Sequence, residues 1–183
     1  MTAFNEQWMA RMAQGDSQAF ASVYEATKSS VYGFALSIVQ NRADAEDVMH
    51  DAYINLYKSA GQYEAQGKPM AYLLKIVKRL AYNKLRSGRH LADMEDDQRE
   101  RTAARADHTT GMEQQVEDQA LLDMALKVLD DQERQIVVLH ALTGLKHREI
   151  AELMELGLST VLSKYRRSLA KMKNELELKG VSL

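Results

Sequence analysis

The chain has 183 residues, is 45% hydrophobic and 27% charged, and carries a net charge of −2 and no cysteine. These values fit a globular protein of one or two domains, and they exclude disulfides, thiolate metal sites and a uniformly basic nucleic-acid coat. No apolar stretch reaches the ~20 residues of a membrane-spanning helix, and the first residues do not resemble a secretory signal, so we expect a cytoplasmic protein without membrane insertion.

Apolar residues recur every three or four positions, and proline occurs once. This spacing predicts an all-α protein with almost no strand. The first predicted helix begins at a cap on Asp16 or Ser17 and runs to Val39, with a break near residues 28–30. Asn41 is the expected N-cap of a second helix.

The second helix combines an apolar face with a cluster of acids. Its apolar face comprises Ala45, Val48, Met49, Ala52, Leu56 and Tyr57. Its acids are Asp44, Glu46, Asp47 and Asp51, and beside them stand Met49, His50, Tyr53 and Ile54, which exceed the needs of one inward face. Taken alone, the acids are most simply interpreted as charges that suit a helix N-terminus or solubilise the surface. A metal or catalytic set of Asp47, His50 and Asp51 is disfavoured because no further ligand or nucleophile stands at a suitable spacing.

A loop with Gly61, Gly67 and Pro69 precedes a third helix, predicted over residues 70–87. Six basic residues and no acid lie between positions 71 and 90. We expect the inward face to hold Leu73, Ile76, Val77 and Leu80. Cations beside aromatic rings are what single-stranded nucleic acid requires, and Tyr63 and Tyr82 are the tyrosines least explained by packing.

The segment 91–118 has nine acids, three arginines and few large apolar side chains. It can bury little surface to offset the entropy of ordering, so we interpret it as a flexible or partly helical linker. The predicted division is a domain over 1–88, an acidic linker over 89–115 and a second domain over 116–183.

The second domain has the pattern of a helix-turn-helix. Helices are expected over residues 116–129, 131–142, 147–154 and 159–178, with glycine-containing turns at 143–145 and 155–157. Ser159 is the expected cap of the last helix, whose inward face is predicted to be Val161, Tyr165, Leu169, Met172 and Leu176. Its outward face is predicted to be Thr160, Ser163, Lys164, Arg167 and Lys171. An ordinary helical hairpin is the alternative, but the acid-free basic stretch over 158–174 favours a DNA-binding helix-turn-helix.

Two sets of motifs occur in a fixed order. The first comprises Gly-Asp-Ser-Gln-Ala-Phe at 15–20, Arg-Ala-Asp-Ala-Glu-Asp-Val at 42–48 and Ala-Tyr-Leu-Leu-Lys-Ile-Val at 71–77; the second comprises segments 125–129, 133–137, 149–153 and 159–161. The first set resembles sigma region 2 and the second sigma region 4 of the extracytoplasmic-function sigma factors, a group of the sigma-70 family. The resemblance covers nearly the whole chain.

The resemblance implies a non-enzymatic transcription initiation factor without cofactor or metal. Its implied partners are core RNA polymerase, through the β′ coiled coil and the β flap, promoter DNA, and an anti-sigma factor. The implied polymerase-binding residues are Asp44, Glu46, Asp47, His50, Asp51, Tyr53 and Ile54. The residues implied near the −10 element, which the protein would help to melt, are Tyr63, Tyr72, Lys75, Lys78, Arg79, Tyr82, Asn83 and Arg86. The residues implied near the −35 element are His147, Arg148, Ser159, Thr160, Leu162, Ser163, Lys164, Arg166, Arg167 and Lys171.

The sequence departs from the family pattern at several of these positions. Tyr72 stands where the family usually has Trp, Asp130 stands where it has Pro, and Leu162 replaces an expected cation. Leu162 suits either a thymine methyl or a protein partner. Two alternatives therefore stay open: a sigma-like decoy or adaptor that binds protein without initiating transcription, and a repressor that uses only the helix-turn-helix. An enzyme is the least favoured class.

Overall fold

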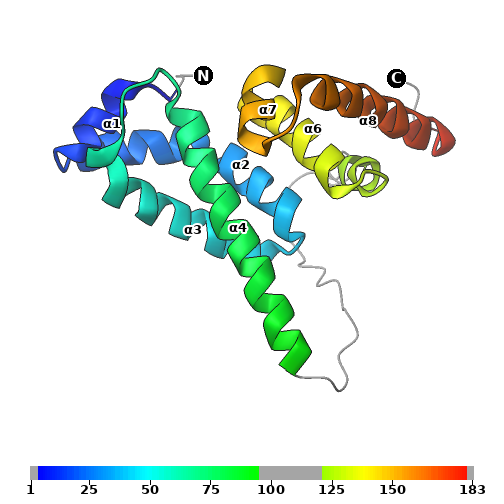
Figure 1. Cartoon of the computed structure of the whole chain (residues 1–183), viewed down its shortest axis with the longest axis horizontal. Helices are drawn as coiled ribbons and strands as arrows, with labels where there is room; N and C mark the ends of the chain where they lie inside the picture. The colour runs from blue at the N-terminus through cyan, green and yellow to red at the C-terminus, as the bar shows by residue number, and fades with distance from the viewer. Residues whose placement is uncertain (1–3, 95–120, 181–183) are drawn as a thin grey trace. The chain divides into compact units, whose positions relative to one another are not determined.

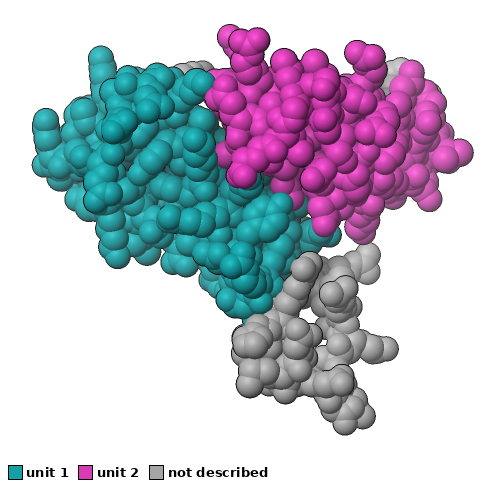
Figure 2. All heavy atoms as spheres, in the orientation of Figure 1, with its two compact units in different colours: residues 1–104 teal, residues 105–183 magenta. Residues whose placement is uncertain are grey.

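The computed structural model of the chain describes residues 4–94 and 121–180, with side chains over 4–88 and 121–180. All the regular secondary structure in these ranges is helical, which confirms the all-α prediction. The chain divides into two compact units, Met1–Ala104 and Arg105–Leu183, coloured separately in Figure 2. Most of the predicted linker lies outside the described residues.

Within residues 4–94, the first unit contains four α-helices and one 3-10 turn (Figure 1). They are α1 (Glu6–Ala13), α2 (Ser17–Val39), α3 (Arg42–Ser59), η1 (Ala60–Gln62) and α4 (Pro69–Met94). Helices α2, α3 and α4 pack against one another, while α1 packs against α2 and η1. Large apolar side chains from all four helices, such as Met9, Phe34, Leu56 and Leu73, are fully buried between them.

Helix α2 begins where the sequence predicts and has no break. The Asp16 carboxylate accepts hydrogen bonds from the backbone amides of Gln18 and Ala19, which is the expected cap. The predicted interruption at 28–30 is wrong, since the helix is continuous there. The buried Thr27 hydroxyl, just before this segment, donates its hydrogen bond to the Val23 carbonyl of the same helix.

Helices α3 and α4 are largely as predicted. The Asn41 side chain accepts from the Asp44 amide at 3.0 Å and caps α3. In α4, the predicted inward residues Leu73, Ile76 and Val77 are buried. Helix α4 is longer than the predicted 70–87: it starts at Pro69, a residue suited to the first helical position, and it continues through Gly88 to Met94.

The second unit contains a helical segment at 121–127, then α6 (Asp131–Thr143), α7 (His147–Met154) and α8 (Leu158–Leu178). Helices α6, α7 and α8 pack against one another around Ile136, Leu139, Ile150 and Val161. Gly144 ends α6 and Glu155 ends α7, both in the left-handed conformation, so both predicted turns are present. Helices α7 and α8 form the predicted helix-turn-helix.

Ser159 does not cap α8. The N-cap is Gly157, which has no side chain to accept a hydrogen bond, and Ser159 is already inside the helix. No helix within the described residues is long and apolar enough to cross a membrane.

Candidate nucleic-acid interface

The exposed side of α3 carries acids next to an apolar residue. Positions 47, 50, 51 and 54 are three or four residues apart and therefore share one face of the helix. Ile54 is 50% exposed there. The acidic α3 surface, as we call it, comprises Asp44, Glu46, Asp47, His50, Asp51 and Ile54, all of them exposed except the half-buried Asp44. Exposed apolar area ringed by charge is suited to a protein partner.

Tyr53 does not belong to this surface, although the sequence analysis placed it among the contacts. It is 2% exposed, and its hydroxyl shares a 2.7 Å hydrogen bond with Thr27. Burial raises the pKa of this phenol well above its usual value. Tyr57 was predicted to face inward and is instead 44% exposed. Tyr53 therefore belongs to the inward face of α3, where the Thr27 hydroxyl is a buried hydrogen-bond partner for the Tyr53 hydroxyl.

A lysine of α4 reaches the acidic α3 surface. Lys84 Nζ lies 2.8 Å from Asp47 Oδ2 and 3.3 Å from Asp44 Oδ1. The hydrogen bond with Asp47 raises the pKa of Lys84, and the same bond lowers the pKa of Asp47. One cation of the basic helix is thus directed to α3 and away from the other cations.

The remaining cations of α4 form a stripe on its exposed side. Positions 75, 79, 82 and 86 lie on one helical face, and no acid occurs from Pro69 to Gly88. The basic α4 face, as we call it, comprises Lys75, Lys78, Arg79, Tyr82, Asn83 and Arg86, all exposed except the half-buried Lys78. Cations alternating with an exposed tyrosine ring can neutralise phosphates and stack a base.

The loop before α4 brings two tyrosines together. The rings of Tyr63 and Tyr72, both half-buried, lie 5.1 Å apart in an edge-to-face arrangement. Between them, Glu64, Ala65 and Gln66 form an exposed tip. The structure therefore places this loop at the start of the helix that carries the basic α4 face.

Helix α1 and its Glu6 were not predicted from the sequence. The side chain of Asn5 accepts from the Trp8 amide at 3.2 Å and caps this helix, and Met9 and Met12 are buried. A capping Asn followed by apolar residues at helical spacing was the available signal. Glu6 contacts the loop, at Tyr63 and Gly67.

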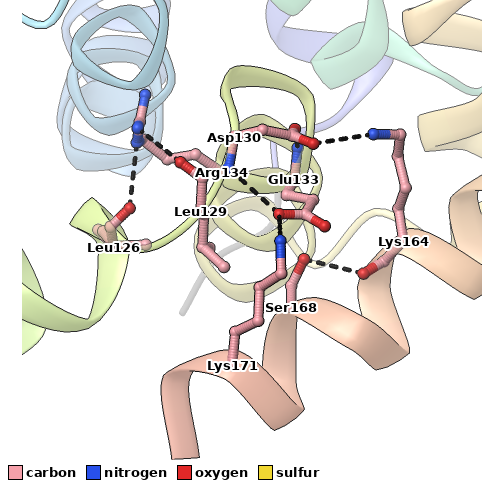
Figure 3. Close-up of polar contacts among 8 residues, drawn as sticks. All are labelled: Leu126, Leu129, Asp130, Glu133, Arg134, Lys164, Ser168 and Lys171. Atoms are coloured by element: carbon pink, nitrogen blue, oxygen red, sulfur yellow. Dashed lines mark hydrogen bonds and ion pairs between the residues drawn. The ribbon is translucent and has the colours of Figure 1, made fainter. Parts of the chain in front are cut away.

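Helix α8 is rotated relative to its predicted orientation. Its inward face centres on Val161 and Ser168, which are buried, whereas Leu169, predicted to be inward, is exposed. Lys164 and Lys171, predicted to face outward, point toward α6 (Figure 3). The rotation follows from the chemistry of α6, which begins with two acids that α8 must meet.

Lys164 Nζ lies 3.1 Å from Asp130 Oδ2, and Lys171 Nζ lies 2.6 Å from Glu133 Oε2 (Figure 3). Asp130 and Glu133 also form a capping box at the start of α6. The Glu133 side chain is only 3% exposed. Burial raises the pKa of its carboxyl, but the hydrogen bonds from Lys171 and the Asp130 amide outweigh burial and leave the pKa lowered. These lysines stabilise the unit by pairing with acids.

His147 is the other predicted −35 contact that packs inward. Its half-buried ring stacks on His140 at 4.5 Å and meets the edge of Tyr165 at 4.7 Å. Its Nε2 is buried and has no hydrogen-bond partner. Burial, followed by the nearby His140, lowers the pKa of His147, so the neutral ring is favoured.

The exposed side of the helix-turn-helix keeps the other predicted residues. Leu162 is 41% exposed. The exposed α7–α8 face, as we call it, comprises Arg148, Ser159, Thr160, Leu162, Ser163, Arg166 and Arg167. Three arginines with small hydroxyl side chains at the start of a helix can contact phosphates and base edges of duplex DNA. Among the described side chains, no group of three His, Asp or Glu residues could hold a metal ion.

Two family models match the chain. The model described as "Sigma-70 region 2" matches residues 23–90, and the one described as "Sigma-70, region 4" matches residues 119–172. Together they cover more than half of the chain, in the order that the sequence motifs indicated.

Curated relatives cover nearly the full length. The ECF RNA polymerase sigma factor SigK of Mycobacterium sp. strain KMS is 29% identical over 171 residues, which is 90% of this chain and 86% of that protein. The protein of the same name from Mycobacterium bovis strain BCG is 27% identical over 175 residues, which is 92% and 91% of the two chains.

Solved structures share the fold. CnrH, determined in complex with the cytosolic domain of CnrY, has a TM-score of 0.67 at 19% identity over 96% of this chain and 98% of its own. The sigma factor RpoE of Bartonella quintana, determined with the anti-sigma factor NepR, has a TM-score of 0.68 at 19% identity over 86% and 96%. With both region models and these full-length relatives, the chain belongs to the extracytoplasmic-function group of the sigma-70 family, whose members are non-enzymatic transcription initiation factors.

Proposed function

We propose that this protein binds core RNA polymerase, directs it to promoters with −10 and −35 elements, and helps to open the −10 element. It acts in the cytoplasm, needs no cofactor and performs no chemistry of its own. The observation that carries the proposal is the pairing, within one unit, of the basic α4 face with the acidic α3 surface. One surface suits a DNA strand and the other a protein.

The basic α4 face, with Tyr63 and Tyr72 at its start, is proposed to hold the −10 strand. An acid-free stripe of cations attracts phosphates along its length, and exposed Tyr82 offers a ring to an unstacked base. Stacking requires an unpaired base and therefore favours single-stranded over paired DNA, which gives the protein a means to stabilise the melted promoter.

The acidic α3 surface is proposed to bind the β′ coiled coil of polymerase. Its carboxylates can pair with cations of a partner, and Ile54 and Tyr57 provide exposed apolar area beside them. The β flap is proposed as a further polymerase contact of the second unit.

The exposed α7–α8 face is proposed to bind the −35 element as duplex. Lys164, Lys171 and His147 are left out of this face because they pack against α6 or Tyr165. Leu162 stands among the arginines, where it can contact a thymine methyl.

An anti-sigma factor is a proposed third partner, since RpoE was solved with one. Leu158, Leu162 and Leu169 lie on one stripe of α8 and are exposed, which suits a protein surface. The same observation favours the second candidate function, a sigma-like decoy that binds protein without initiating transcription. The basic α4 face favours initiation, because a decoy has no need to bind phosphate.

Run-off transcription with purified core polymerase tests the proposal, using a genomic promoter library. We expect start sites that share −35 and −10 elements. The double variants Lys75→Glu/Arg79→Glu and Asp47→Lys/Asp51→Lys should each lose activity by roughly tenfold or more, since each reverses two exposed charges in a contact. The first should still bind core polymerase, and the second should not.

Lys127→Glu/Lys179→Glu is the matched control, because both lysines are exposed and lie outside the three proposed surfaces. It should retain wild-type transcription. Absence of specific transcripts from the wild-type chain with active core enzyme, together with a tight complex with another protein, would favour the decoy.

A further inference from the structure

One carboxylate of α1 joins the two ends of the loop that precedes α4. Glu6 Oε1 accepts a hydrogen bond from the Tyr63 hydroxyl at 3.1 Å and a second from the backbone amide of Gly67. Tyr63 and Gly67 flank the exposed tip at 64–66. The two bonds therefore close the loop at its base and leave its tip in solvent.

The carboxylate is held by a well-anchored helix. The side chains of Met9 and Met12 are buried and anchor α1 to the rest of the unit, and Asn5 caps the first turn of this helix. Glu6 stands at the first position of that helix. Hydrogen bonds to an ionised acceptor are stronger than neutral ones, so this contact can impose one position on an otherwise exposed segment.

The loop also has contacts that do not involve Glu6, because the backbone amides of Gln66 and Lys68 interact with the Tyr63 hydroxyl. The ring contact between Tyr63 and Tyr72 orients the first end of the loop. Gly67, at the second end, has a φ of 70°. Glycine adopts this left-handed conformation without steric penalty, so the chain can turn there. The bond from its amide to Glu6 is what ties that end to α1.

We propose that Glu6 is a positioning residue for −10 recognition, acting through the loop. This inference rests on the proposed function, in which the loop and the basic α4 face meet the −10 strand. A loop that is ordered before binding loses less entropy on binding and presents its tip in one place. Discrimination between promoters then depends on that fixed position, whereas a loosened loop would accept different sequences more equally.

The test compares Glu6→Ala with the conservative Glu6→Gln in the full-length chain. The amide oxygen of Gln can accept both hydrogen bonds but carries no charge, so Glu6→Gln should lose part of the effect, whereas Glu6→Ala loses both bonds. Gln7→Ala is the matched control, since Gln7 is the exposed neighbour of Glu6 on the same helix. Each variant is assayed with core polymerase on promoters that share one −35 element and differ only within the −10 element.

We expect the ratio of transcription from the best −10 sequence to that from single mismatches to fall roughly tenfold in Glu6→Ala, about the value of one charged hydrogen bond. Hydrogen exchange in the peptide covering 60–68 should rise in the same variant. Dependence on the −35 element should match wild type. Glu6→Gln should change these quantities less than Glu6→Ala does, and Gln7→Ala should change none of them appreciably.

A wild-type −10 ratio in Glu6→Ala would overturn the inference. Equal loss on all promoters, together with a lowered thermal midpoint, would also overturn it, because it would show that Glu6 merely stabilises the unit. If the wild-type chain itself made no transcripts that depend on the −10 sequence, the proposed function would fail first, and this inference with it.

Discussion

Helices α4 and α8 are similar in sequence, since both carry long acid-free basic stretches, but they differ in their neighbours. Helix α4 packs against α2 and α3 through apolar side chains such as Leu73 and Val77, so Lys75, Arg79 and Arg86 remain exposed, whereas Lys84 pairs with acids of α3. Helix α8 packs against α6, whose first turn offers Asp130 and Glu133 to its lysines. A cation in a basic stretch therefore indicates a nucleic-acid surface only where no acid of a packing neighbour pairs with it, as acids pair with Lys84, Lys164 and Lys171.

The largest expected effect comes from removing cations from each helix in turn. Lys75→Ala/Arg79→Ala should weaken promoter binding by the holoenzyme and reduce the slope of log affinity against log salt by about 0.7 per lost contact to a single strand. Lys164→Ala/Lys171→Ala should leave that slope unchanged and lower the thermal midpoint. Affinities measured at several salt concentrations check both. Equal loss of slope in the two variants would contradict the distinction between the helices.

A smaller effect is expected from the acid that α8 meets. Glu133→Ala removes the capping bond to the Asp130 amide and leaves Lys171 without its partner, so we expect the second unit to lose about 1–3 kcal/mol of unfolding free energy. Glu133→Gln keeps the capping bond and should lose less. Gln132→Ala, exposed on the same turn, is the control in denaturant unfolding. Equal stability of Glu133→Ala and Gln132→Ala would show that the pair contributes nothing.

The smallest expected effect is a pH dependence confined to the second unit. The folded-state pKa of His147 is lowered, so below its unfolded value of 6.5 the unfolded chain binds more protons than the folded one. Stability should therefore be full above pH 6.5 and decline as the pH falls through the interval between the two pKa values. Thermal melts between pH 7.5 and 5 should show the decline in wild type and less of it in His147→Phe. His50→Phe, at an exposed position of the first unit, should leave the decline intact.

Much of the fold follows from local signals. The caps at Asp16 and Asn41, the glycine-containing turn at 143–145 and the apolar spacing of α4 each depend on a few neighbouring residues, and each was predicted. Helix α1 was missed although Asn5 and its buried methionines gave the same kind of signal. The end of α4 was predicted at residue 87, whereas the helix continues to Met94.

The sequence predicted which helical faces form the candidate sites, but it predicted the orientation of single side chains on them less well. Periodicity identified the acidic α3 surface and the basic α4 face, yet it could not determine which way Tyr53 or Lys171 points. Those orientations depend on Thr27 and Glu133, partners 26 and 38 residues away in the sequence. A polar side chain on the edge between two helical faces turns toward whichever partner the tertiary structure supplies, and single-helix patterns do not contain that information.

Lys84 gives the two surfaces of the first unit a common element. Because its ammonium is shared between Asp44 and Asp47, any cation that binds those carboxylates must displace it, and any anion that captures it leaves them unpaired. Linkage makes this competition reciprocal: a ligand on one helix and a ligand of opposite charge on the other each raise the affinity for the other by the same factor. Binding of a cation to Asp44 and Asp47 and binding of an anion to Lys84 are therefore expected to be positively cooperative.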